Sequence, residues 1–180
     1  MFLKGTAVLA CLGFFSLSAA YDITSVVEDG IPGSLKISTE PFVRIGHGYY
    51  YIESKVTKNW YEAYESCRRM NADLIAFETI EEWDLIRQYI VDLEVRSIYW
   101  TAGNDLGNEG KHVWHSTGEP LTLNIWSPGE PNNKEGVEHC DEVWYHEARA
   151  FNLLNDRDCS LKRRFICEAP QPKIASFIIW

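Results

Sequence analysis

The sequence lacks several patterns that would assign it to a common enzyme or structural class. It contains no HExxH, GxSxG or P-loop signature, so it offers none of the usual frameworks for zinc hydrolysis, serine hydrolysis or nucleotide binding. It contains no collagen-like repeat, which excludes a collagenous stalk, and no Asn-x-Ser/Thr acceptor for an N-linked glycan. Beyond the first twenty residues, no apolar run approaches the length of a membrane span. We therefore expect a protein that is not an enzyme and is not embedded in a membrane.

Positive charge is also scarce, since 17 Lys and Arg residues stand against 26 Asp and Glu residues. The formal net charge of −9 repels phosphate groups, which makes nucleic acid and anionic membrane surfaces poor partners. The 180 residues are 46% hydrophobic and 13% aromatic, which is enough to form one globular domain with a buried core. Clustered carboxylates in such a domain are suited to holding a hard cation.

The beginning of the chain, residues 1–20, has the pattern of a secretory signal peptide. Lys4 precedes an apolar run over residues 5–20 that ends in Ser-Ala-Ala, with small residues where a signal peptidase requires them. Cleavage before Tyr21 would leave a secreted, extracellular protein that begins with a short leader at residues 21–41. An uncleaved anchor is the weaker interpretation, because an apolar run of about 16 residues is marginal for spanning a bilayer.

Removal of the signal peptide would also remove Cys11 and leave an even number of cysteines, namely Cys67, Cys140, Cys159 and Cys167. In an oxidising compartment these four residues predict two disulfides, and three pairings are open. A zinc site is the competing interpretation. It is disfavoured because the spacings lack the closely placed cysteine pairs of zinc sites.

The rest of the chain predicts an α+β fold. Residues 42–45 and 49–52 are typical of a hairpin around a three-residue loop. Two amphipathic helices follow, one capped by Asn59 and one over residues 80–93 that begins with a capping-box pattern. Long polar segments then alternate with short β-like runs at residues 98–100, 111–114, 142–145 and 164–167. Loops of this length usually carry function, so we expect two helices followed by a small antiparallel sheet with functional loops.

Two groups of polar residues occur in these long segments. One is the Glu-Pro-Asn-Asn segment 130–133, followed by Glu138, and the other is the Asn-Asp pair 155–156. Each group alone is typical of a turn, but each also lies shortly before a cysteine of one candidate disulfide, Cys140 or Cys159. If these cysteines pair, the two groups come together as a set of carboxylate and amide oxygens, which suits Ca²⁺ better than zinc or copper. The set consists of Glu130, Asn132, Glu138, Asn155 and Asp156.

Further motifs extend this pattern over most of the chain. They are Trp60 and Ala63 ahead of Cys67, Tyr-Trp-Thr-Ala-Gly at 99–103, Trp-Ser-Pro-Gly-Glu-Pro-Asn at 126–132, Glu-His-Cys at 138–140, Leu-Asn-Asp at 154–156 and Phe-Ile-Cys-Glu at 165–168. In combination, they make residues 42–169 resemble a C-type lectin domain. The resemblance implies the short four-cysteine form of that fold, with disulfides Cys67–Cys167 and Cys140–Cys159.

The resemblance also implies a function, which is calcium-dependent carbohydrate binding. It makes the five oxygen-bearing residues named above the principal calcium and sugar ligands. Glu130 and Asn132 would supply one acceptor and donor pair to a sugar hydroxyl, and Glu138 and Asn155 would supply the other. The peptide bond before Pro131 is expected to be cis.

The Glu-Pro-Asn form of the family motif is associated with mannose-type sugars, and the Gln-Pro-Asp form with galactose. We therefore expect mannose, fucose or N-acetylglucosamine, while galactose remains open. Resemblance to secreted lectins suggests that the ligands are glycans on microbial or host cells, with innate-immune recognition, agglutination or encapsulation as the outcome. Since a single site of this kind binds weakly, several copies of the domain, as in a homo-oligomer, would be needed for avidity.

A second calcium site of the family would use four residues: Asp105, Glu109, Asn133 and Glu138. We expect it to bind an ion weakly or not at all, because Asn133 and His139 stand where acids are common. Two more histidines, His112 and His115, are interpreted as exposed strand residues in preference to a metal pair.

Two questions stay open in the sequence. The runner-up function is a secreted protein-binding module of the same fold, for example a reproductive or seminal-fluid protein. The apolar tail, residues 170–180, is too short to span a bilayer and could pack on its own domain or on a partner.

Overall fold

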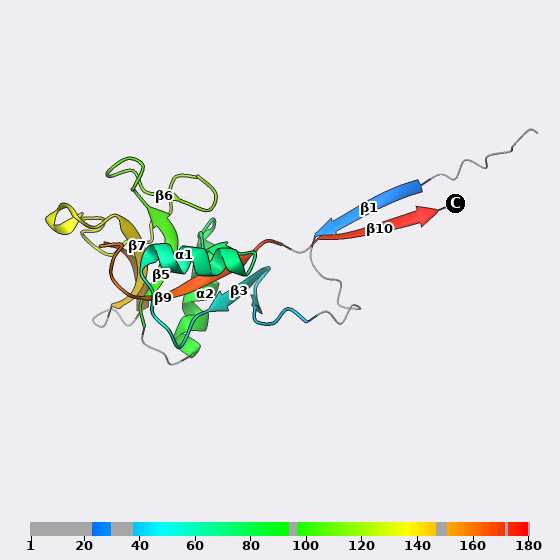
Figure 1. The fold of residues 1–180 in the computed structure, drawn as a ribbon, viewed down its shortest axis with the longest axis horizontal. Coiled ribbons are helices and arrows are strands. Elements are labelled where there is room, and N and C mark those ends of the chain that lie inside the picture. Colours follow the sequence, from blue (N-terminus) through cyan, green and yellow to red (C-terminus); the bar gives the residue numbers. More distant parts are fainter. Residues whose placement is uncertain (1–22, 30–37, 94–96, 147–150, 172, 180) are drawn as a thin grey trace, which may run out of the picture.

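The computed structural model describes residues 23–29, 38–93, 97–146, 151–171 and 173–179, so the predicted signal peptide lies outside the described residues. Within them the chain has the predicted α+β character (Figure 1). The helices are α1 (Trp60–Arg69) and α2 (Ile80–Asp92), with a short 3-10 turn, η1 (Lys134–Gly136). The strands are β1 (Ile23–Asp29), β2 (Val43–Ile45), β3 (Gly48–Ile52), β4 (Asp73–Leu74), β5 (Tyr99–Asn104), β6 (Val113–Trp114), β7 (Cys140–His146), β8 (Phe151–Arg157), β9 (Arg164–Ala169) and β10 (Lys173–Ile179).

Eight of these strands form one sheet in the order β2-β3-β9-β5-β7-β8, with β4 paired to β9 and β6 paired to β5. The sheet is mixed, not wholly antiparallel as the sequence predicts, because β5 and β9 run parallel with Tyr99 opposite Arg164. A parallel pair needs a long crossover, and the polar loops together with the β7–β8 hairpin provide it. Strand β8 is missing from the sequence prediction, yet it pairs with β7 along its whole length.

The predicted first hairpin is present as β2 and β3, with a shorter turn than expected. Ile45 pairs with Gly48, so the turn contains two residues. One of them, Gly46, has a φ of 59°, a conformation that glycine adopts without strain because it has no Cβ.

Helix α1 begins where the sequence predicts because Asn59 caps it. The Glu62 N–H donates to Asn59 Oδ1 at 2.8 Å, and the Asn59 N–H donates to Glu62 Oε2 at 3.2 Å. This reciprocal box satisfies two backbone donors at the helix start. The predicted face is buried at Trp60, Ala63 and Cys67, and it packs on the sheet at β4, β5 and β9.

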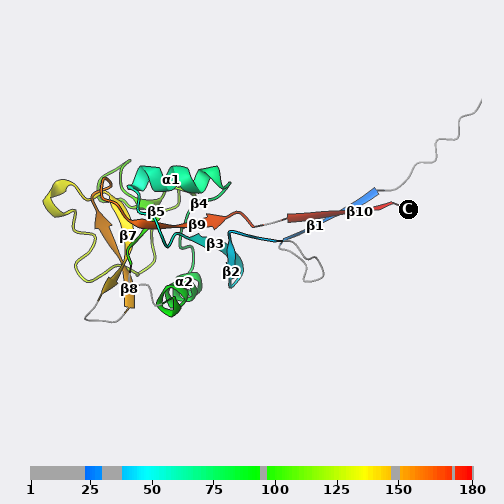
Figure 2. The ribbon, with the colours of Figure 1, turned by 60° about the horizontal axis from the view of Figure 1, so that its bottom comes forward.

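Helix α2 lies on the opposite side of the sheet from α1 (Figure 2). It begins after Thr79, whose side-chain oxygen accepts a hydrogen bond from the Glu82 N–H at 3.1 Å. Ile80 and Leu93, which the periodicity assigned to the apolar face, are 44% and 39% exposed because they stand at the helix ends, where fewer neighbours cover them. The remainder of the predicted face is buried, at Trp83, Ile86 and Ile90.

Both disulfides implied by the resemblance are confirmed. Cys67–Cys167 ties α1 to β9 across a sequence separation of 100 residues, and Cys140–Cys159 ties the start of β7 to the segment after β8 across 19. In the chain-entropy model, these closures stabilise the fold by about 5 and about 3 kcal/mol, respectively.

Strands β1 and β10 form a separate two-stranded antiparallel sheet, with Ile23 opposite Ile179 and Asp29 opposite Lys173. In both views it extends away from the rest of the molecule, on the side opposite the loop that contains η1 (Figures 1 and 2). The apolar tail thus pairs with the leader segment of its own chain, an arrangement for which the sequence offered no specific signal.

Neither helix in the described part of the chain has the length and apolar character that a membrane span requires.

Candidate functional site

The β7–β8 hairpin presents the first part of the predicted site. Its register places Asn155 opposite Glu142 and Asp156 opposite Asp141, so the Asn-Asp pair lies inside a strand and the turn interpretation of it is wrong. The reason is long-range, since pairing with β7 over seven residues outweighs the local turn preference of this dipeptide.

The loop between β6 and β7 contributes the second part. The Glu130–Pro131 bond is cis, as predicted. The backbone N–H groups of Asn132 and Asn133 donate to the two carboxylate oxygens of Asp156, at 3.1 and 2.7 Å. Asp156 is fully buried, and it therefore anchors the Glu-Pro-Asn-Asn segment to β8 across more than twenty residues of sequence.

Glu130 lies against this anchor in an environment that disfavours its negative charge. Burial, its hydrogen bond to Asp156 and the charges of Asp156 and Glu138 raise the pKa of Glu130 from 4.5 to about 7, although a hydrogen bond from Asn132 acts in the opposite direction. Its Oε2 atom is buried and has no hydrogen-bond partner. A pair of carboxylates with an unpaired buried oxygen is a site where a cation would relieve a real electrostatic cost.

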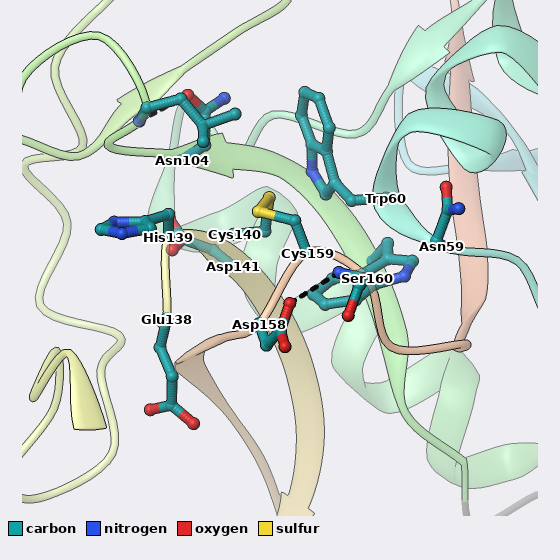
Figure 3. The surroundings of a disulfide bond; sticks show 12 residues. Asn59, Trp60, Asn104, Glu138, His139, Cys140, Asp141, Asp158, Cys159 and Ser160 are labelled. Atoms are coloured by element: carbon teal, nitrogen blue, oxygen red, sulfur yellow. Dashed lines mark hydrogen bonds between the residues drawn. A yellow bond between two sulfur atoms is a disulfide. The ribbon is translucent and has the colours of Figure 1, made fainter. Parts of the chain in front are cut away.

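Glu138, the next predicted ligand, is 5% exposed and is held from several directions. Its N–H donates to Asn133 Oδ1 at 3.0 Å, and its Oε2 accepts from the Lys134 N–H at 3.3 Å. Its Oε1 accepts a hydrogen bond from Arg157 Nη1 at 2.6 Å. Figure 3 shows that the Glu138 side chain points away from the neighbouring Cys140–Cys159 disulfide.

Two residues that sequence reasoning missed, Glu142 and Arg157, connect the predicted ligands Glu138 and Asn155. Asn155 Nδ2 donates to Glu142 Oε1 at 3.3 Å, and Arg157 Nε lies 3.5 Å from the same oxygen. Arg163 Nε donates to the other oxygen, Oε2, at 2.6 Å. Glu142 is fully buried, so these cationic and amide partners satisfy its charge. The only feature of the sequence that could have indicated Arg157 is its position directly after the Asn-Asp pair. No feature of the sequence connects Glu142 with this pair.

The residues predicted for a second calcium site are joined by internal hydrogen bonds. Asn133 Nδ2 donates to Glu109 Oε1 at 2.8 Å, while Asn133 Oδ1 accepts from Glu138. Asp105 accepts from the Gly110 N–H at 2.7 Å and lies 2.9 Å from His139 Nδ1. Asn133 thus connects Glu109 with Glu138, whereas Asp105 is bonded to Gly110 and His139, which are not members of the set.

The prediction that His112 is an exposed strand residue is wrong. Its side chain is 6% exposed, and its Nδ1 lies 2.8 Å from Oδ1 of the fully buried Asp141. The carboxylate partner raises the pKa of His112 above its ordinary value, against the effect of burial. His115 is exposed, as predicted, and packs edge-on against Trp60 and Tyr64.

A family model described as the lectin C-type domain matches residues 56–169. The chain belongs to the C-type lectin family. C-type lectin 37Da of Drosophila melanogaster is 39% identical over 173 residues, which are 92% of each chain. Salivary C-type lectin 1 of Aedes albopictus is 36% identical over 118 residues, 63% of this chain and 77% of that one.

Solved structures share the fold of this C-type lectin. The carbohydrate-recognition domain of the mouse scavenger receptor C-type lectin superposes with a TM-score of 0.64 at 24% identity, over 75% of this chain and 98% of that one. A complex of SPL-1 with GlcNAc superposes with a TM-score of 0.62 at 25% identity, over 73% and 93%. The superpositions show the C-type lectin fold, and the family to which the chain belongs is a family of non-enzymatic binding domains.

The donor set of this C-type lectin fits a hard cation in its chemistry. Among the residues that the structure describes, no group of three or more His, Cys, Asp or Glu side chains is arranged to hold a metal ion. The predicted set relies on two amides, and Glu138, one of its three carboxylates, is bound to Arg157. The fit therefore rests on Glu130 and Asp156, a close pair of carboxylates in which one buried Glu130 oxygen has no hydrogen-bond partner.

Proposed function

We propose that this C-type lectin binds carbohydrate in a calcium-dependent manner through Glu130, Asn132, Glu138, Asn155 and Asp156. The observation that carries the proposal is the Glu130–Asp156 pair, in which one buried carboxylate oxygen has no partner and the pKa of Glu130 is raised to about 7. Both features describe a site that is incomplete without a positive charge. Oxygen donors of mixed charge favour Ca²⁺ over softer metals.

The side chains around the pair can recognise neighbouring hydroxyl groups of a sugar. Bound calcium would supply a Lewis-acidic centre to which two such hydroxyls coordinate. Glu130 and Asn132 provide an acceptor and a donor on one side, and Glu138 and Asn155 provide the same combination on the other. Each hydroxyl can thereby accept one hydrogen bond and donate another, which gives specificity for a diol.

The sugars favoured by this arrangement are mannose, fucose and N-acetylglucosamine, because the chain carries the Glu-Pro-Asn order at 130–132. The related structure of SPL-1 was solved as a GlcNAc complex, which supports this class. Galactose binding is the alternative result of the test below.

An extracellular location agrees with the two disulfides and with the salivary relative from Aedes albopictus. We propose that the protein is secreted and recognises glycans on microbial or host cells, with agglutination or encapsulation as the outcome. A protein-binding role without sugar is the competing function. It would be favoured if the domain bound calcium but no glycan.

Chromatography of the mature protein on mannose-agarose and galactose-agarose tests the proposal. We expect retention on the mannose column in roughly 5–10 mM calcium, a concentration above the dissociation constants of about 0.1–1 mM that are typical of extracellular calcium sites. EDTA should release the protein. Glu130→Gln removes one acidic donor and should abolish retention. Glu135→Gln, an equal charge change at an exposed residue of the same loop, is the matched control and should be retained. Retention that EDTA does not release would contradict the calcium-bridged mechanism.

A further inference from the structure

Arg157 occupies a position that a calcium-binding site does not need. It is the last residue of β8, directly after the Asn-Asp pair, and its backbone is fixed opposite Cys140. Its Nη1 donates to Glu138 Oε1 at 2.6 Å, with side-chain exposures of 34% for Arg157 and 6% for Glu138. A strong charge-assisted hydrogen bond therefore occupies an oxygen that the proposed site assigns to calcium and sugar.

We propose that Arg157 is a built-in competitor for Glu138 and that it lowers the calcium affinity of the site. The inference rests on the proposed function, because it concerns an ion that the five ligands would hold. In the calcium-free protein the guanidinium neutralises Glu138 and keeps it next to Asn133. When calcium binds, the Arg157–Glu138 hydrogen bond must break or lengthen, and this cost is subtracted from the binding free energy.

The surroundings of Arg157 make such an exchange feasible. Its Nε lies 3.5 Å from Glu142 Oε1 and forms no hydrogen bond, so the guanidinium has a second carboxylate to which it can turn. The charge of Arg157 is permanent, since both carboxylates hold its pKa above an already high value. Arg157 therefore cannot stop competing with calcium for Glu138 by losing its proton. After it releases Glu138, it can remain paired with Glu142.

Arg163 provides a matched control within the same network. Its Nε donates to Glu142 Oε2 at 2.6 Å, and its side chain is 20% exposed. Within the described part of the chain, its side chain contacts Glu142, the Lys162 carbonyl oxygen and the Trp100 ring, and it forms no hydrogen bond or ion pair with Glu138. Arg163→Gln removes the same charge and the same kind of Glu142 partner as Arg157→Gln, but it leaves the Arg157–Glu138 bond in place.

Isothermal titration of the full mature chain with CaCl₂ tests the inference. We expect Arg157→Gln to bind calcium about tenfold more tightly than the wild type, which corresponds to about 1.4 kcal/mol. Arg163→Gln should change the affinity by less than about twofold by the same measure. Arg157→Lys keeps the charge without the planar fork and should lie between the wild type and Arg157→Gln, which keeps the inference testable if the glutamine variant does not fold.

Thermal unfolding provides a second readout that does not depend on sugar binding. In EDTA, Arg157→Gln should unfold at a lower temperature than the wild type, because Glu138 loses its counter-charge, and saturating calcium should close much of that gap. Unchanged or weaker calcium binding by a folded Arg157 variant would overturn the inference while leaving the proposed function intact. If the wild type and Arg163→Gln both fail to bind calcium, the proposed function fails instead.

Discussion

Calcium binding near neutral pH is expected to release a proton from Glu130. In the calcium-free protein the pKa of this carboxyl is about 7, raised from 4.5 by burial and by Asp156 and Glu138. A metal ligand must give up its proton to bind. Calcium should therefore displace about half a proton at pH 7, about nine-tenths at pH 6 and about one-tenth at pH 8.

The sign of the pH dependence follows from the same shift. Because the folded, calcium-free state keeps its proton to higher pH than the unfolded chain does, this group makes the fold less stable as pH rises from about 4.5 to about 7. Bound calcium would offset that loss of stability by supplying a positive charge next to Glu130. The apparent calcium affinity should therefore fall as the pH decreases below 7 and level off above it.

Titration calorimetry at pH 7.0 in PIPES and in imidazole, whose ionisation enthalpies differ, measures the released proton directly. The control is Glu135→Gln, which should release the same number of protons as the wild type. Calcium binding with no proton release at pH 6 and pH 7 would falsify the electrostatic description of the Glu130–Asp156 pair.

Three further predictions concern stability. Burial and neighbouring carboxylates raise the pKa of Glu168 to about 8, so the free energy of unfolding of the wild type should decrease as the pH rises from 4.5 to 8. In urea unfolding, Glu168→Gln should gain at most about 4 kcal/mol of stability relative to the wild type over this range. The exposed control, Glu81→Gln, should gain none. Asn59→Ala should lower the free energy of unfolding by about 1 kcal/mol, and Asn59→Asp, which keeps the capping oxygen, should lower it far less; equal losses would argue against the cap. Replacing Cys140 and Cys159 together with Ala should cost about 3 kcal/mol in urea unfolding and weaken calcium binding, and full retention of both properties would show that the disulfide does not hold the hairpin.

Much of the fold could be predicted because the relevant signals are local. The cap at Asn59 and the three-to-four-residue spacing behind it require only neighbouring residues, and both appear in α1 as predicted. Strand β8 could not be predicted in this way. Its Asn-Asp pair has a turn preference, and only the partner strand, more than ten residues earlier in the chain, makes it extended.

The sequence by itself determined the class of protein. The order of its cysteines, aromatic residues and the Glu-Pro-Asn segment was sufficient to indicate a resemblance to the C-type lectin domain, and that resemblance implied the two disulfides and the set of oxygen ligands. These features are encoded by residue identity and spacing, so they can be seen without coordinates.

Only the tertiary structure decided how the side chains of this predicted ligand set are held. It placed the backbone of Asn132 on Asp156, buried Glu142 between two arginines and bonded Arg157 to Glu138. These contacts depend on strand register and loop conformation, which join residues far apart in the chain. The physical reason is that the partner of a buried charge is set by the three-dimensional packing of the whole domain. The linear order of residues does not give the distances between side chains that this packing brings together.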